Sequence, residues 1–168
     1  MNEYSLSTRT HDLARRVLDA CKGAGLRVST AESCTGGLVA ASLTEIAGSS
    51  QVVDRAFVTY NDKAKHDMLG VGTELLERVG AVSSEVACAM AEGALAHSRA
   101  DLAVSVTGIA GPGGAEEGKP VGLVFVGVAR TGATSSAERR VLPGDRHAVR
   151  SAALVWALET LLAHSGVD

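Results

Sequence analysis

The stretch "TAESCTGG" contains side chains that can take part in covalent chemistry. Ser33 and Cys34 are potential nucleophiles, and Gly36 and Gly37 allow the backbone to approach a ligand closely. If a helix begins after the glycines, its free N–H groups could bind an oxyanion or a phosphate. A simpler interpretation is that Ser33 or Thr35 only caps this helix, a common role for both residue types. The local sequence leaves both interpretations open.

The stretch "TYNDKAK" offers a candidate base. Lys63 and Lys65 are half a helical turn apart, so at most one of them would face a site next to Tyr60. A lysine on a short helix is usually a solvated charge. A desolvated lysine has a lowered pKa, however, and can take a proton from a serine hydroxyl.

The stretch "TGIAGPGGAEEGKP" could present backbone amides to a ligand. Thr107 ends an apolar strand and is followed by Gly108, Gly111 and Gly113. The segment is not a phosphate-binding loop of the nucleotide triphosphatases, because Pro120 replaces the required Ser or Thr and a strand follows. The alternative is a flexible surface loop.

The last helix begins with polar residues that could also serve a site. Asp145 is a good capping residue, and Arg146 could bind an anion or remain solvated, with Arg150 one turn further on. The five histidines show no HxH or HxxxH pairing, so we expect no metal site.

Strand-like and helix-like segments alternate along the chain. Alternation and β-branched residues predict strands at 26–32, 52–60, 102–108 and 121–130, the last forming a hairpin with 135–142. Helical spacing predicts helices at 10–24, 36–48, 61–70, 83–98 and 145–164. We therefore expect one α/β domain, residues 1–168, built as a three-layer αβα sandwich with a mixed, mainly parallel sheet. Ligands of such sheets bind at the strand ends, where the three polar loops would meet.

Composition limits the classes of partner. The net charge is −3 and no cluster of Lys and Arg is visible, which argues against nucleic-acid binding. The three cysteines have no disulfide or zinc spacing, and no apolar segment is long enough for a signal peptide or a membrane span. We therefore expect a soluble cytoplasmic protein that binds no membrane. Aromatic residues make up only 3% of the chain, so the core must consist of small side chains in close contact.

Six stretches, in order, resemble the CinA carboxy-terminal domain family: "TAESCTGG", "FVTYNDKAKHDMLGV", "GAVSSEVA", "ADLAVSVTGIAGPGG", "KPVG" and "GDR". The resemblance covers nearly the whole chain. Members include stand-alone nicotinamide-nucleotide amidohydrolases, which convert nicotinamide mononucleotide to nicotinate mononucleotide and ammonia. Longer members carry a further amino-terminal domain, which we do not expect here.

The resemblance implies roles for individual residues. Ser33 would be the nucleophile, Lys65 the base and Tyr60 a supporting residue, with Thr107 and the adjoining glycines near the substrate. Lys65 is chosen over Lys63 because it precedes "HDMLGV" at the family spacing.

The implied chemistry agrees with the residue types. Neutral Lys65 would remove the Ser33 proton, and N–H groups near Thr35 to Gly37 would stabilise the oxyanion. Arg146 and the "GPGG" loop would hold the nucleotide phosphate. Neither a metal nor an organic cofactor is required.

Two other functions remain open. A thiol amidase could use Cys34 with Lys65 and Glu32. The protein could also be a nucleotide-binding regulatory module without turnover.

The last helix also bears on association. In "AVRSAALVWALETLLAHSG" apolar side chains, Trp156 among them, surround much of the helix. We therefore expect a homodimer or another homo-oligomer in which a second subunit covers part of this helix. The alternative is that helices of the same chain cover all of it.

Overall fold

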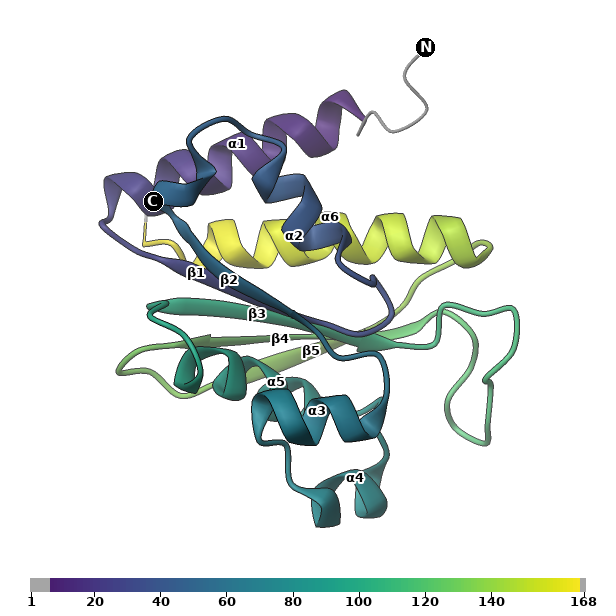
Figure 1. Cartoon of the computed structure of the whole chain (residues 1–168). Coiled ribbons are helices and arrows are strands. Elements are labelled where there is room, and N and C mark those ends of the chain that lie inside the picture. The colour runs from purple at the N-terminus through teal and green to yellow at the C-terminus, as the bar shows by residue number, and fades with distance from the viewer. Residues whose placement is uncertain (1–6, 167–168) are drawn as a thin grey trace.

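The structure, a computed structural model, describes residues 7–166. Within this range one sheet contains five strands: β1 (Val28–Glu32), β2 (Val53–Val58), β3 (Leu102–Gly108), β4 (Leu123–Arg130) and β5 (Ser136–Val141). Their order across the sheet is β2-β1-β3-β4-β5 (Figure 1). The segments predicted as strands are therefore strands.

The sheet is mixed. β1 lies between β2 and β3 and pairs in parallel with both, whereas β4 pairs antiparallel with β3 and with β5. β1, β2, β3 and β5 thus point the same way, and β4 runs against them. The predicted hairpin of β4 and β5 is confirmed, as is the mixed sheet.

Helices cover both faces of the sheet, as Figure 1 shows. One face carries α1 (Thr8–Gly23), α2 (Leu38–Thr44) and α6 (Arg146–His164), and the other carries α3 (Asp62–Leu69), α4 (Thr73–Val79) and α5 (Ser84–Ala96). A short 3-10 helix, η1 (Ser49–Gln51), precedes β2. The prediction of a three-layer αβα sandwich is confirmed. In the described part of the chain, no helix has both the length and the apolar character needed to cross a membrane.

Small residues let α5 approach its neighbours closely. A Cβ atom on Gly127 of β4 would lie 2.5 Å from the carbonyl oxygen of Ala87. A Cβ atom on Gly93 of α5 would lie 2.1 Å from the carbonyl oxygen of Leu69, the last residue of α3. Both distances are far below van der Waals contact, so these positions accept only glycine without a shift of backbone. The expected close packing of small residues is present here.

Most of the apolar surface of α6 is covered by the same chain, although Ala152, Val155 and Leu162 stay partly exposed. α6 packs on β3 and β4 and against α1 and α2. Trp156 is only 3% exposed, and the guanidinium carbon of Arg140 lies 4.2 Å from the centre of its ring. The same chain therefore covers most of this helix, and a homo-oligomer that uses its partly exposed apolar side chains stays a prediction.

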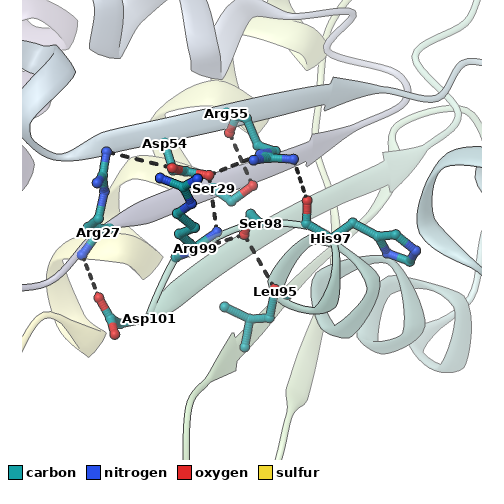
Figure 2. A network of polar contacts seen from close by, with 10 residues as sticks. Arg27, Ser29, Asp54, Arg55, Leu95, His97, Ser98, Arg99 and Asp101 are labelled. Atoms are coloured by element: carbon teal, nitrogen blue, oxygen red, sulfur yellow. Dashed lines mark hydrogen bonds and ion pairs between the residues drawn. The ribbon is translucent and has the colours of Figure 1, made fainter.

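A polar network joins the amino ends of the parallel strands (Figure 2). The carboxylate of Asp54 in β2 accepts hydrogen bonds from Arg55 Nε at 2.9 Å and from the N–H of Arg99 at 3.1 Å. Arg27 Nη2, next to β1, lies 3.6 Å from the same carboxylate, and the N–H of Arg27 donates to Asp101, next to β3. The network holds β1, β2 and β3 together at their amino ends, opposite the carboxyl ends where the predicted site lies.

Candidate active site

The loops predicted to form a site leave the carboxyl ends of β1 and β2. Ser33 directly follows β1, and its N–H donates to the carbonyl oxygen of Val106 in β3 at 2.9 Å. The N–H of Thr59 donates to the carbonyl oxygen of Glu32 at 2.8 Å. These two bonds continue the parallel ladders and fix where Ser33 and Tyr60 leave the sheet.

Lys65 reaches Ser33 from the other loop. Asn61 caps α3, because its side chain accepts a hydrogen bond from the N–H of Ala64 at 2.8 Å. Lys65 lies one turn into this helix, where its Nζ donates to the carbonyl oxygen of Thr59 at 3.0 Å and lies 3.2 Å from Ser33 Oγ. The structure thus brings the predicted nucleophile and the predicted base within hydrogen-bond distance.

Burial changes the chemistry of Lys65. The residue is 1% exposed, and desolvation lowers its pKa below the ordinary value of 10.5, although Asp62 acts in the opposite direction. A lowered pKa makes the neutral amine available as a base. Lys63 points away, as predicted for residues half a turn apart: its side chain is 81% exposed and pairs with Asp67.

The thiol next to the serine is a poor nucleophile. Cys34 is 6% exposed and belongs to the apolar core under α1 and α6. Desolvation raises its pKa to about 11, so the thiol stays protonated at neutral pH. Ser33 Oγ faces Lys65, whereas the thiol of Cys34 lies in the apolar core.

The start of α2 is capped by a side chain that precedes the turn. The carboxylate of Glu32, fully buried, accepts hydrogen bonds from the N–H groups of Gly37, Val39 and Ala40 at 3.0, 3.1 and 2.9 Å. No hydroxyl of the turn caps the helix. The interpretation of Ser33 or Thr35 as the cap is therefore wrong.

The same contacts change which N–H groups are available for an oxyanion. Gly36 and Gly37 have φ values of +60° and +98°, a left-handed conformation that favours glycine. The N–H of Gly36 donates to the carbonyl oxygen of Ser33 at 3.0 Å, and that of Gly37 donates to Glu32. Both expected donors are therefore already occupied, which leaves the N–H of Thr35 as the candidate donor of this turn.

Tyr60 and Arg146 meet at the mouth of the site. The hydroxyl of Tyr60, which is 58% exposed, accepts a hydrogen bond from Arg146 Nη2 at 2.6 Å. Arg146 Nη1 donates to the carbonyl oxygen of Gly111 at 2.8 Å. The structure therefore joins three predicted residues, although no hydrogen bond in the described part of the chain links Tyr60 to Ser33 or Lys65.

Three other predicted positions make structural contacts. The buried Thr107 hydroxyl donates to the carbonyl oxygen of Ala81 at 2.8 Å. Gly108 packs against β4, where an added Cβ would lie 2.7 Å from the carbonyl oxygen of Leu123. Gly113 is exposed, with no atom within 4 Å of the position of an added Cβ. The contacts of Thr107 and Gly108 shape the loop after β3, and the hydroxyl of Thr107 is already paired.

A cleft opens between this loop and the start of α6. Its volume is about 670 Å³, and it is lined by Ala110, Pro112, Val121, Gly144, Asp145, Arg146, His147 and Arg150. An apolar floor therefore meets a rim that carries two arginines, a composition suited to a ligand with both a ring and an anionic group.

Sequence reasoning placed Arg150 in the last helix but assigned it no contact. In the structure its Nε donates to the carbonyl oxygen of Cys34 at 3.1 Å, and its Nη2 donates to that of Thr35 at 3.0 Å. Cys34 lies 116 residues earlier in the chain, so no local pattern could have indicated the contact. The capping role of Glu32 was missed for a different reason: the prediction considered only hydroxyls in the turn.

Comparison with known proteins gives consistent results. The model of the CinA C-terminal domain matches residues 10–164. Nicotinamide-nucleotide amidohydrolase PncC of Escherichia coli K12 is 50% identical over 149 residues, which cover 89% of this chain and 90% of that protein. The crystal structure of competence/damage inducible protein CihA from Agrobacterium tumefaciens has 53% identity and a TM-score of 0.91, with 95% of this chain and 98% of that chain covered.

A longer relative is matched only in part. The putative competence-damage inducible protein of Caldicellulosiruptor saccharolyticus is 48% identical over 96% of this chain, but the chain spans only 39% of that protein. The match to the family model extends from α1 to α6. On this basis, the chain belongs to the CinA C-terminal domain family.

Proposed function

We propose that this protein is a nicotinamide-nucleotide amidohydrolase, which converts nicotinamide mononucleotide and water to nicotinate mononucleotide and ammonia during pyridine nucleotide recycling. The observation that carries the proposal is the buried Lys65 amine 3.2 Å from Ser33 Oγ. A relative that carries the name of this activity is 50% identical over most of its length. We further propose a cytoplasmic location, because the free cysteines fit a reducing compartment.

In the first half of the reaction, neutral Lys65 accepts the Ser33 proton while Ser33 Oγ attacks the carboxamide carbon. The N–H of Thr35 stabilises the resulting oxyanion, a contribution of about 2.7–4 kcal/mol per donor in other hydrolases. The C–N bond then breaks, and protonated Lys65 gives its proton to the departing ammonia. An ester of Ser33 and the pyridine carboxyl group remains.

In the second half, water attacks this ester and passes a proton to Lys65. The bond to Ser33 Oγ breaks, and the proton held by Lys65 returns to the serine. Nicotinate mononucleotide leaves, and the enzyme is restored without any metal or organic cofactor. Tyr60, whose hydroxyl still has a proton to donate, supports the reaction from the mouth of the site.

The cleft at the start of α6 is the proposed place for the nucleotide part of the substrate. Arg146 lies on its rim and is exposed, so it can exchange its contacts with Tyr60 and Gly111 for a phosphate. The apolar wall formed by Ala110 and Val121 suits a sugar or ring face.

The test is incubation of the purified protein with nicotinamide mononucleotide, followed by assays for ammonia and nicotinate mononucleotide. Ser33→Ala should lower kcat by about 10³-fold or more, whereas Cys34→Ala should remain active. An active serine variant together with an inactive cysteine variant would favour the thiol amidase. Binding of the nucleotide without ammonia release would favour the regulatory module.

The same assay, run with a metal chelator, tests whether activity needs a metal ion. Among residues 7–166, no group of three or more His, Cys, Asp or Glu side chains is placed to hold a metal ion. Because the proposed base is Lys65, activity should survive EDTA. Loss of activity on chelation and its recovery with one added divalent ion would contradict the mechanism.

A further inference from the structure

The turn that carries Ser33 is held from two sides by side chains of opposite charge. On one side the Glu32 carboxylate accepts the N–H groups of Gly37, Val39 and Ala40. Glu32 is fully buried, so water does not compete for these bonds. A carboxylate bonded to the free N–H groups of a helix start also gains from the helix dipole. The amino end of α2 is thereby fixed relative to β1.

On the other side the Arg150 guanidinium binds two carbonyl groups of the turn. Nε donates to Cys34 and Nη2 to Thr35, the two residues that follow the nucleophile. A planar guanidinium with two donors in a fixed fork sets both the distance and the orientation of these carbonyls. Arg150 thus connects the Ser33 turn to α6, the helix that also carries Arg146.

These contacts decide what Glu32 and Arg150 are available for. The carboxylate of Glu32 is occupied by three N–H groups, so it is not free to act as the third member of a catalytic set. Arg150 lines the cleft beside Arg146, but it is half-buried and its Nε and Nη2 donate to carbonyl groups of the turn, whereas Arg146 is exposed. Both Glu32 and Arg150 are therefore placed to fix the position of the turn.

The sheet fixes the backbone before Ser33, whereas Glu32 and Arg150 hold the turn that follows it. The N–H of Ser33 bonds to Val106, its carbonyl accepts the N–H of Gly36, and its Oγ faces Lys65. A misplacement of about 1 Å at a reacting atom can cost about 10²-fold in rate. The path of the turn after Ser33 therefore sets how well Oγ meets the amine.

We propose that Glu32 and Arg150 are positioning residues that together hold the Ser33 turn, Glu32 by its N–H groups and Arg150 by its carbonyl groups. This inference rests on the proposed function, in which Ser33 is the nucleophile. Each acts by fixing the positions of Ser33 Oγ and of the Thr35 N–H, and Arg150, which also lines the cleft, does so through the carbonyl groups of the turn.

The first experiment compares Arg150→Met, Arg150→Lys and Arg139→Met in the hydrolysis of nicotinamide mononucleotide. Arg139 is an exposed arginine of β5 whose side chain makes no hydrogen bond or ion pair within residues 7–166, and it serves as the matched control. Arg150→Met should lower kcat by about 10²-fold with little change in KM, and Arg150→Lys should recover part of the loss because an ammonium can bind one of the carbonyls. A raised KM with unchanged kcat would overturn the proposal and identify Arg150 as a substrate contact.

The second experiment needs no nucleotide. A fluorophosphonate reacts with an activated serine: Oγ bonds to phosphorus, fluoride leaves, and the proton passes to Lys65. In Arg150→Met the rate of Ser33 labelling should fall by about the same factor as kcat. In Arg139→Met the labelling rate should equal that of the wild type. If the wild type labels but does not hydrolyse nicotinamide mononucleotide, the proposed function fails and the labelling rates still test the positioning role. Equal labelling of Arg150→Met and wild type overturns it.

A double-mutant cycle tests whether the two residues act together. Glu32→Gln keeps the shape but turns an NH₂ group toward N–H donors, so it should also lower the labelling rate. If both residues hold one turn, the loss in Glu32→Gln/Arg150→Met should be smaller than the product of the two single losses. A double-mutant loss equal to the product of the two single losses would overturn the joint role. If Glu32→Gln does not fold, as circular dichroism would show, the Arg150 variants decide alone.

Discussion

At the scale of single residues, the burial of Lys65 is energetically unfavourable for a charged amine. Lysine is almost never fully buried unless its charge is paired, yet Lys65 is 1% exposed and its amine contacts only the Thr59 carbonyl and the Ser33 hydroxyl. No carboxylate bonds to this amine in the described part of the chain. The surroundings therefore favour the neutral amine, which is the form that a general base requires.

A pair of lysine variants separates this role from a general effect of charge. Lys65→Met should lower kcat by about 10²–10⁴-fold, because it removes the base. Lys63→Met removes an exposed side chain paired with Asp67 and should change kcat by less than about threefold. Steady-state assays with ammonia detection measure both. Equal activity of Lys65→Met and wild type would contradict the assignment of the base.

The lowered pKa of Lys65 predicts the pH dependence of the reaction. The fraction of neutral amine increases as pH rises through the lowered pKa, so kcat should rise with a midpoint below pH 10.5, the ordinary value. The native state also releases this proton at lower pH than the unfolded chain. The wild type should therefore gain stability relative to Lys65→Met as pH rises between the two pKa values. An acidic limb of kcat centred at or above pH 10.5 would contradict this explanation.

At the scale of elements, α5 determines where α3 and therefore Lys65 lie. Gly93 of α5 faces the last residue of α3, with no room for a methyl group between the helices. Gly127 lets the same helix lie directly on β4. The site thus depends on two close contacts in the layer below it.

Gly93→Ala should therefore affect stability and activity together. The added methyl group must push α3 away from α5, which should cost about 1–3 kcal/mol of unfolding free energy and lower kcat through Lys65. Gly23→Ala is the control, because nothing lies within 4 Å of its added Cβ and its φ is not positive. Thermal unfolding and kcat of both variants check the prediction. An unchanged melting temperature in Gly93→Ala would refute the close contact.

Most elements could be predicted because their signals are local. Alternation and β-branched residues indicated all five described strands, and Asp145 and Asn61 cap helices that the sequence indicated. α2 begins at Leu38, later than predicted, because the two glycines before it have positive φ values, and it ends at Thr44, before the predicted end at residue 48. α4 was not predicted: its seven residues are too short to show a clear helical period.

At the scale of the whole molecule, the site is assembled from segments far apart in the sequence. The resemblance to a family indicated Ser33, Lys65 and Tyr60, and the structure places the first two in contact. The contact of Arg150 with Cys34 depends on how α6 packs over the Ser33 turn. Such packing is a property of the assembled layers, so residue types and spacing could not reveal it.

Association is the remaining prediction at this scale. The sheet ends in two strands, β2 and β5, each paired on one side only. Such edges offer unpaired N–H and C=O groups to a second chain, so an edge is a second candidate surface, beside the partly exposed side of α6, for the expected homodimer or other homo-oligomer. Sedimentation equilibrium at micromolar concentration tests it. A mass near the 17.1 kDa of one chain would contradict the prediction.

The packing of Arg140 on Trp156 has a practical consequence. Trp156 is the only tryptophan of the chain, it is almost fully buried, and it lies on the helix that carries Arg146 and Arg150. Intrinsic fluorescence therefore reports from a single place, the junction of β5 and α6. Its emission should shift to longer wavelength when the chain unfolds and stay unchanged in Arg150→Met. A change in emission on adding nicotinamide mononucleotide would mean that binding moves α6.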